Sequence, residues 1–164
     1  MVVSNASPLI ILSKLGLLHL LPDLFGDVRI APEVFNEVVV AGDGRPASTA
    51  IQNATWIKVQ PCTNTSLLQT WVQKYGMGSG ELATILLVKE ISANAVILDE
   101  RASRLLATAS GLKVIGCVGV LEIGHRKGLI RDLRNTYQQM LKQGVYITPQ
   151  ILNCSLASLK LSLI

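Results

Sequence analysis

Short apolar runs alternate along the chain with longer segments of helical character. Strands usually appear in a sequence as runs of four to eight apolar or β-branched residues between turn signals. Four runs fit that description, Asp27–Ile30, Trp56–Gln60, Ala95–Leu98 and Lys113–Gly116, and Val2–Val3 with the residues around it forms a shorter β-like run. The run at Ala95–Leu98 is continuously apolar, as expected for a central strand of a parallel sheet.

The intervening segments predict helices. Pro8–Phe25 is expected to form two short helices broken at Gly16 and Pro22, and Pro32 is expected to begin a helix that runs to about Val40. Four further helices are predicted at Ala47–Ala54, Thr65–Tyr75, Glu81–Ser92 and Arg101–Ser110, with Gly-containing loops at 41–46 and 76–80, and two or three more follow to the C-terminus.

This alternation predicts an α/β fold with a central, mostly parallel sheet covered by helices on both faces. The length of 164 residues suits one domain, residues 1–164. Ligands of such sheets bind beyond the carboxyl ends of the strands, near the point where the strand order reverses. The positions just after Val3, Ile30 and Leu98 are therefore the first candidates for a site.

The composition limits the possible environment of the protein. Apolar residues make up 49% of the chain and charged residues 16%, and this apolar excess fits a buried sheet, an oligomer interface, or both. Polar residues interrupt the longest apolar stretches, so none reaches the roughly 18 to 20 residues of a membrane span. No Lys or Arg precedes the apolar run that starts at Pro8, so we expect no secretory signal, no membrane partner and a cytoplasmic location.

Several common kinds of site are excluded or weakly supported. Cys62, Cys117 and Cys154 are odd in number and form no CxxC pair, so buried free thiols are expected rather than zinc ligands or disulfides. The Gly-rich stretch 76–80 lacks the last glycine of a dinucleotide fingerprint, where Glu81 stands, and it follows a predicted helix. No Gly-Lys-Ser/Thr sequence supports a P-loop.

Four polar residues stand in apolar surroundings: Asn5, Glu37, Glu81 and Asp99. The last three are notable because the chain has only eleven acidic residues. Asn5 and Asp99 each follow a predicted strand. Each residue also has a structural explanation: Glu37 could point outward from its helix, and Glu81 could favour a helix N-terminus. Asp99 and Asn5 could cap the helices that follow them.

Acidic side chains that converge at one sheet edge suit the hydrolysis of a phosphodiester with divalent metal ions. Mg²⁺ takes oxygen ligands and keeps several waters. Such ions activate a water molecule and stabilise the leaving oxygen. Crowded carboxylates repel one another unless a cation neutralises them, so a cluster implies a metal.

The ordered set of motifs resembles a branch of the PIN-domain family that is similar to VapC-type toxins. The motifs are Ser4–Ile10, Pro32–Glu37, the Gly-x-Gly-Glu element at 78–81, Leu98–Arg104, 111–116 with 119–121, and 127–130, which together span Val2 to about Gln150. The resemblance implies a PIN-like three-layer sandwich. It also implies cleavage of single-stranded RNA with Mg²⁺ or Mn²⁺, a homodimer, and a small antitoxin protein as partner.

By position, the resemblance assigns the metal site to Asn5, Glu37, Glu81 and Asp99, with Glu100 as a further candidate and Glu37, Glu81 and Asp99 as the catalytic acids. The family usually has Asp where this chain has Asn5. An amide oxygen can coordinate a cation but brings no negative charge, so this departure puts the activity in doubt more than the fold.

Basic residues supply candidates for contacts with RNA phosphates. The net charge is +4, which is compatible with a polyanionic partner. Arg101 and Arg104 share one side of a helix that begins next to Asp99, and Arg126 and Lys127 belong to a second basic stretch. Either set could instead be a solvated helix face.

Three hypotheses follow for the function. The first is an Mg²⁺- or Mn²⁺-dependent endoribonuclease that acts as the toxin of a toxin–antitoxin pair. The second is a degenerate PIN module that binds protein or RNA without cleavage because Asn5 replaces Asp. The third is an unrelated small α/β binding protein, in which the four side chains would not converge.

Overall fold

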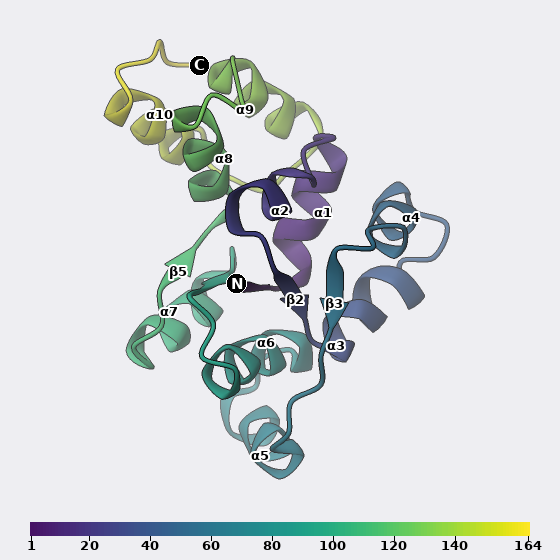
Figure 1. The fold of residues 1–164 in the computed structure, drawn as a ribbon. Coiled ribbons are helices and arrows are strands. Elements are labelled where there is room, and N and C mark those ends of the chain that lie inside the picture. Colours follow the sequence, from purple (N-terminus) through teal and green to yellow (C-terminus); the bar gives the residue numbers. More distant parts are fainter.

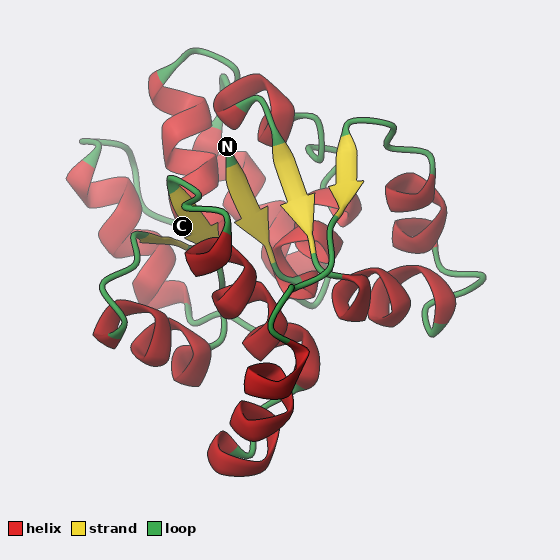
Figure 2. Cartoon of the chain, turned by 60° about the horizontal axis from the view of Figure 1, so that its bottom comes forward, coloured by secondary structure: helices red, strands yellow, loops and turns green.

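A sheet of five short strands forms the centre of the protein. The computed structural model describes residues 1–164. The strands are β1 (Val2–Ser4), β2 (Val28–Ile30), β3 (Ile57–Val59), β4 (Ala95–Ile97) and β5 (Val114–Ile115). Their order is β3-β2-β1-β4-β5, and all neighbouring pairs are parallel (Figure 2). All five predicted strands are present.

Ten α-helices and one π-helical segment connect and follow the strands. The first six elements are α1 (Ala6–Lys14), α2 (Leu20–Phe25), α3 (Pro32–Phe35), the π-helix η1 (Asn36–Val40), α4 (Pro46–Gln52) and α5 (Thr65–Tyr75). The others are α6 (Ser79–Glu90), α7 (Arg101–Ala109), α8 (Cys117–Arg126), α9 (Leu133–Lys142) and α10 (Pro149–Ser158).

Helices cover both faces of the sheet, which confirms the predicted three-layer α/β sandwich. Helix α6 contacts β1 and β4 and, with α5, lies below the sheet in Figure 1. Helices α1, α2 and α8 lie above it, and α8 contacts both of the others. Because both faces are covered, every residue of β1 and β4 is buried. This explains why these strands are continuously apolar except at Ser4.

Helix α6 is the most deeply buried helix. Its buried residues include Leu82, Ile85 and Leu87, each with no exposed surface. A helix that is apolar on nearly all sides needs neighbours on all sides, and α6 has the sheet, α3, α5 and α7 around it. Glu81, the one acid near its start, is thereby held at the sheet's edge by a rigid core element.

Two predicted helices differ from those observed. The break in the first pair falls at Gly16, which has a positive φ of 68°, as predicted, but Pro22 lies inside α2. Proline is tolerated there because the first N–H groups of a helix have no partner within it. The predicted helix from Pro32 to Val40 changes at Asn36 into a π-helix, in which Ala41 N–H donates to Asn36 O (2.8 Å).

The C-terminal helices pack on the body of the protein. Helix α10 contacts α8 and α9, and its Leu152 and Leu156 belong to the main core. None of the helices combines the length and the apolar character required to cross a membrane. The cysteines are all free, as predicted, and Cys62 and Cys117 are buried. The prediction of a buried thiol is wrong for Cys154, which is exposed at the surface of α10.

Candidate functional site

The strand order reverses between β1 and β4. From β1 the chain adds β2 and β3 on one side and then β4 and β5 on the other. The residues that follow these two strands, Asn5 and Asp99, therefore flank the position at which such sheets bind ligands. A cavity of about 900 Å³ lies at this edge, lined by residues from α1, α3, η1, α6 and the loops before α6 and α7.

Asn5 is the buried member of the site. Its side chain is 4% exposed, and its backbone N–H donates to Ile97 O (3.0 Å), which ties the end of β1 to β4. Although Asn5 stands at the N-cap of α1, its side chain makes no capping bond, so the capping explanation is wrong. Its Oδ1 is buried, lines the cavity and has no hydrogen-bond partner. A bound cation or a water molecule would satisfy this buried oxygen.

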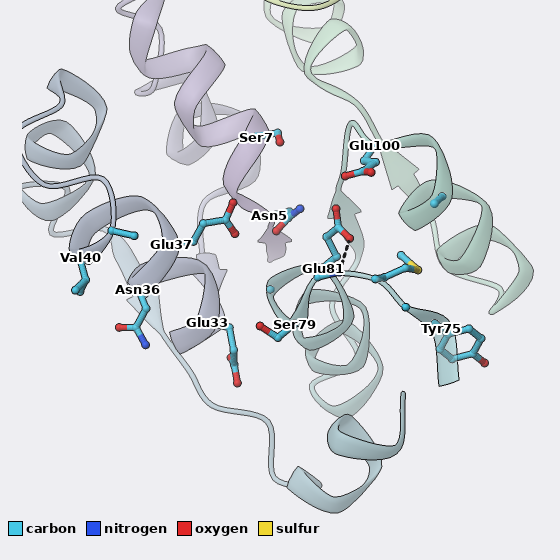
Figure 3. Close-up of a pocket in the computed structure, with 16 residues that line it drawn as sticks. Asn5, Ser7, Glu33, Asn36, Glu37, Val40, Tyr75, Ser79, Glu81 and Glu100 are labelled. Atoms are coloured by element: carbon cyan, nitrogen blue, oxygen red, sulfur yellow. Dashed lines mark hydrogen bonds between the residues drawn. The ribbon is translucent and has the colours of Figure 1, made fainter. Parts of the chain in front are cut away.

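Glu37 reaches the cavity from the π-helix. It is exposed, as the structural explanation anticipated, but its carboxylate turns toward Asn5 in Figure 3, whereas Glu33 and Asn36 point away. A Cβ placed on Gly80 would lie 3.1 Å from Glu37 Oε2 and 3.8 Å from Asn5 Oδ1. The two oxygens therefore lie close to the same glycine. The position of Glu37 on a π-helix is also typical of functional sites, where such turns are frequent.

Glu81 and Glu100 face each other on the opposite wall of the cavity (Figure 3). Glu81 Oε2 accepts a hydrogen bond from Gly78 N–H (3.2 Å) at the start of α6. Burial, together with the hydrogen bond and negative charge of Glu100, raises the pKa of Glu81 from 4.5 to about 7. Two carboxylates that compete for one proton also offer a shared site for a cation.

Asp99 lies beside this cavity rather than in it. It lines a second cavity of about 630 Å³ on the far side of the β4–α7 turn. Its Oδ1 accepts a hydrogen bond from Cys117 N–H (2.7 Å), so it caps α8 and not the helix that follows it. Its Oδ2 is buried without a partner. Burial raises the pKa of Asp99, while the Cys117 N–H and the charge of Arg104 oppose that increase.

The basic candidates separate into three positions. Arg101 begins α7 and is exposed beside Glu100. Arg104 is half-buried, and its Nη1 donates to Leu98 O (2.8 Å), so its guanidinium is engaged within the protein. Arg126 and Lys127 are exposed at the end of α8, which lies beside α9 and α10 in the upper part of Figure 1, away from α3 and α6.

Two residues near the acids escaped the sequence analysis. Ser103 has no exposed surface, its hydroxyl is buried without a hydrogen-bond partner, and its proximity opposes the rise in the pKa of Glu81. It stands three residues after Glu100, the N-cap of α7, and this position in the first turn could have drawn attention to it. Gly80 could have been found from the Gly-x-Gly-Glu element, whose second glycine leaves room for Glu37 and Asn5.

The site offers the kind of ligands that a hard divalent cation requires. Its donors are oxygens only, and Asn5 Oδ1 is orphaned and buried at the cavity wall. No three Asp, Glu, His or Cys side chains stand close enough together to hold an ion on their own. The arrangement therefore fits a cation such as Mg²⁺, which takes one or two protein ligands and keeps several waters, better than one that needs a closed protein cage.

The comparison with protein-family models gives the family. The model described as "PIN domain" matches residues 1–160. This chain belongs to the PIN-domain family. Searches of curated proteins and of solved structures returned no match. The match excludes the hypothesis of an unrelated α/β binding protein and gives the PIN fold to nearly the whole chain.

Membership supports the coarse features expected from the resemblance. The PIN domain is a nuclease-type fold, its members generally use divalent metal ions, and it is associated with RNA binding. In this PIN domain, Asn5, Glu37, Glu81 and Glu100 share one cavity, while Asp99 contacts it only through the turn that it shares with Glu100.

Proposed function

We propose that this PIN domain is an Mg²⁺- or Mn²⁺-dependent endoribonuclease that cleaves single-stranded RNA. The observation that carries the proposal is the convergence of Asn5, Glu37, Glu81 and Glu100 on one cavity beyond β1 and β4. These side chains come from segments far apart in sequence. Packing alone has no use for an unpartnered amide oxygen beside carboxylates.

Each residue of the site has a proposed role. One or two of Asn5, Glu37, Glu81 and Glu100 would bind the cation directly and the others would contact its waters, while Asp99 would act through the turn that it shares with Glu100. A bound Mg²⁺ or Mn²⁺ supplies an activated water and stabilises negative charge on the phosphate. In the metal-free protein Glu81, with a pKa of about 7, exchanges a proton near neutral pH, and a bound cation would hold its carboxylate ionised. Ser103, buried nearby, favours the ionised form of Glu81.

RNA would approach along the rim of the cavity. Arg101 is exposed next to Glu100 and is the basic candidate best placed to contact a phosphate there. Arg126 and Lys127 would contact RNA only if the strand extended over α8. Few aromatic side chains line the cavity, Tyr75 among them, so we expect little base readout by stacking.

We further propose that the domain acts as the toxin of a toxin–antitoxin pair, as a homodimer bound by a small antitoxin protein. Exposed apolar side chains support protein contacts: Val40 (63%) and Tyr75 (37%) lie at the cavity, and Leu105 (62%) lies on α7. Exposed apolar patches commonly mark interaction sites.

A degenerate module is the second candidate, and Asn5 is the observation that favours it. The residue is 4% exposed and at the centre of the site. The natural chain therefore has one charge fewer there than an Asp would give. A site with less negative charge binds a divalent cation more weakly. Such a module would bind RNA or protein without cutting.

The test is cleavage of a mixed-sequence single-stranded RNA with Mn²⁺ by the natural chain, Glu81→Gln and Asn5→Asp. Cleavage by the natural chain that Glu81→Gln abolishes supports the nuclease. Cleavage only after Asn5→Asp supports the degenerate module. Equal cleavage by the natural chain and by Glu81→Gln would show that this site does not carry out the reaction. Asp99→Asn, tested in parallel, decides whether Asp99 contributes.

A further inference from the structure

The turn between β4 and α7 carries two adjacent acids that face different ways. Glu100 lines the candidate site, whereas Asp99 lines the second cavity. The position of Glu100 opposite Glu81 therefore depends on how this turn is fixed. Leu98, at the start of the turn, is bound to β5 through its N–H, which donates to Ile115 O (2.9 Å).

Two further contacts fix the turn from behind. Arg104, one helical turn into α7, folds back and donates from Nη1 to Leu98 O (2.8 Å). Cys117 N–H, the first free N–H of α8, donates to Asp99 Oδ1 (2.7 Å). The negative charge of Asp99 also lies at the favourable, positive end of the α8 dipole. Strand β4, α7 and α8 thus meet at one point.

Gly116 provides the space in which these groups meet. A Cβ at this position would lie 2.7 Å from Arg104 Nη1 and 3.2 Å from Asp99 Oδ1. Any side chain at residue 116 would therefore displace the guanidinium, the carboxylate, or both. Gly116 is the N-cap of α8 with φ −92° and ψ 171°, which other residues adopt, so close approach and not backbone conformation requires the glycine there.

We infer that Arg104 is a positioning residue that holds the Asp99–Glu100 turn, together with Cys117 N–H and Gly116, and is not an RNA contact. Its guanidinium is bound to Leu98 O and lies near Gly116, as Asp99 does, whereas Arg101, three residues earlier on α7, is exposed. The inference rests on the proposed function in one respect, since it assumes that the acids of the turn serve metal binding.

The experiment separates the charge of Arg104 from its position. Gly116→Ala keeps every charge but crowds the guanidinium, whereas Arg104→Ala removes it. Arg101→Ala is the matched control, an arginine on the same helix without an internal partner. For all three variants and the natural chain, Mn²⁺ affinity is measured by calorimetry. The affinity for a fluorescent single-stranded RNA is measured in EDTA at several salt concentrations.

A positioning residue and a phosphate contact give opposite results. We expect Arg104→Ala and Gly116→Ala to weaken Mn²⁺ binding about tenfold or more, as is typical for groups that orient metal ligands, with an unchanged salt dependence of RNA binding. Arg101→Ala should keep its Mn²⁺ affinity and reduce the slope of log K against log salt by about 0.7, the loss of one phosphate contact on a single strand. A reduced slope with normal Mn²⁺ affinity in Arg104→Ala would overturn the inference.

A metal-independent measurement distinguishes failure of the inference from failure of the proposed function. If the natural chain binds no Mn²⁺, the proposed metal site is wrong. Hydrogen exchange at the Cys117 amide then tests the turn itself. We expect exchange at this amide to be about tenfold faster in Arg104→Ala and Gly116→Ala, and unchanged in Arg101→Ala. Unaltered exchange in the first two variants would show that Arg104 does not hold Asp99.

Discussion

Glu81 and Glu100 compete for one proton across the candidate site. The contact connects the start of α6 with the end of the β4–α7 turn, two segments that the sequence separates widely. Together with burial, it raises the pKa of Glu81 to about 7. The protein therefore carries an acid that is largely protonated at mildly acidic pH and largely ionised at mildly basic pH, and this has consequences for stability.

Without added metal, Glu81 should make the protein less stable as pH rises. Between pH 4.5 and about 7 the folded protein keeps a proton that the unfolded chain has lost, so the free energy of unfolding falls across this window. Glu81→Gln cannot ionise and should flatten this dependence. After allowance for its partial exposure, we expect the variant to be more stable than the natural chain by roughly 1 kcal/mol near pH 8.

Thermal unfolding in EDTA at mildly acidic and mildly basic pH measures this effect. Glu90→Gln is the matched control, because the pKa of Glu90 is lowered by bonds from the Thr63 and Asn64 N–H groups. That contribution is present above the unfolded pKa and lost as pH falls, so Glu90→Gln should destabilise at high pH. If Glu81→Gln behaved like Glu90→Gln, the assignment of a raised pKa would be wrong.

Gly80→Ala should weaken metal binding without reducing stability. Alanine favours a helix over glycine by up to about 1 kcal/mol, but its Cβ would lie 3.1 Å from Glu37 Oε2 and force that carboxylate away from Asn5. We expect an unchanged or slightly higher Tm and a several-fold lower Mn²⁺ affinity. Gly119→Ala, within α8, is the control, since its Cβ would meet only an Ile115 methyl group at 3.2 Å. Normal Mn²⁺ affinity in Gly80→Ala would count against Glu37 as a ligand.

Periodicity and strand spacing predict most of this fold. The five strands are short, but each is bounded by turn residues and two are continuously apolar. This pattern indicates a parallel sheet that is covered on both faces. Once the sheet is assumed, Asn5 and Asp99 must lie at its carboxyl edge. What periodicity cannot show is a change of helix type within one segment, and the π-helical turn at Asn36–Val40 was therefore missed.

The cavity lies at the sheet edge where the sequence predicts a site, but the side chains that face it could not all be predicted. Asp99 and Glu100 are adjacent, and a sequence cannot tell which of two neighbours faces the cavity. The answer depends on the hydrogen bond that Asp99 accepts from Cys117 N–H, at the start of another helix, and on the nearby charge of Arg104. The basic residues show the same difficulty, since Arg101 and Arg104 share a helix side, yet only the latter has a carbonyl partner within the protein.

One buried hydrogen bond between α9 and α10 should add to the stability of the packed C-terminal helices. Tyr137 has no exposed surface, and its hydroxyl lies 2.6 Å from Ser155 Oγ of α10. We expect Tyr137→Phe and Ser155→Ala each to reduce the free energy of unfolding by about 1 to 2 kcal/mol, because each leaves a buried partner unsatisfied. The double variant should lose about 1 kcal/mol less than the sum of the two. Additive losses in urea unfolding would mean that the two hydroxyls do not interact.

The end of the π-helix should depend on Gly42. A Cβ there would lie 2.2 Å from Val38 O and 3.1 Å from Val38 C, so any side chain must displace the backbone next to Glu37. We expect Gly42→Ala to cost about 1 to 3 kcal/mol of stability and to lower Mn²⁺ affinity as well, because Glu37 moves with η1. Gly44→Ala is the control: its positive φ of 77° makes it strained, but open space surrounds it and it lies outside η1. Gly44→Ala should lower the free energy of unfolding but leave the Mn²⁺ affinity unchanged. Normal Mn²⁺ affinity in Gly42→Ala would show that the π-helix does not position Glu37 for metal binding.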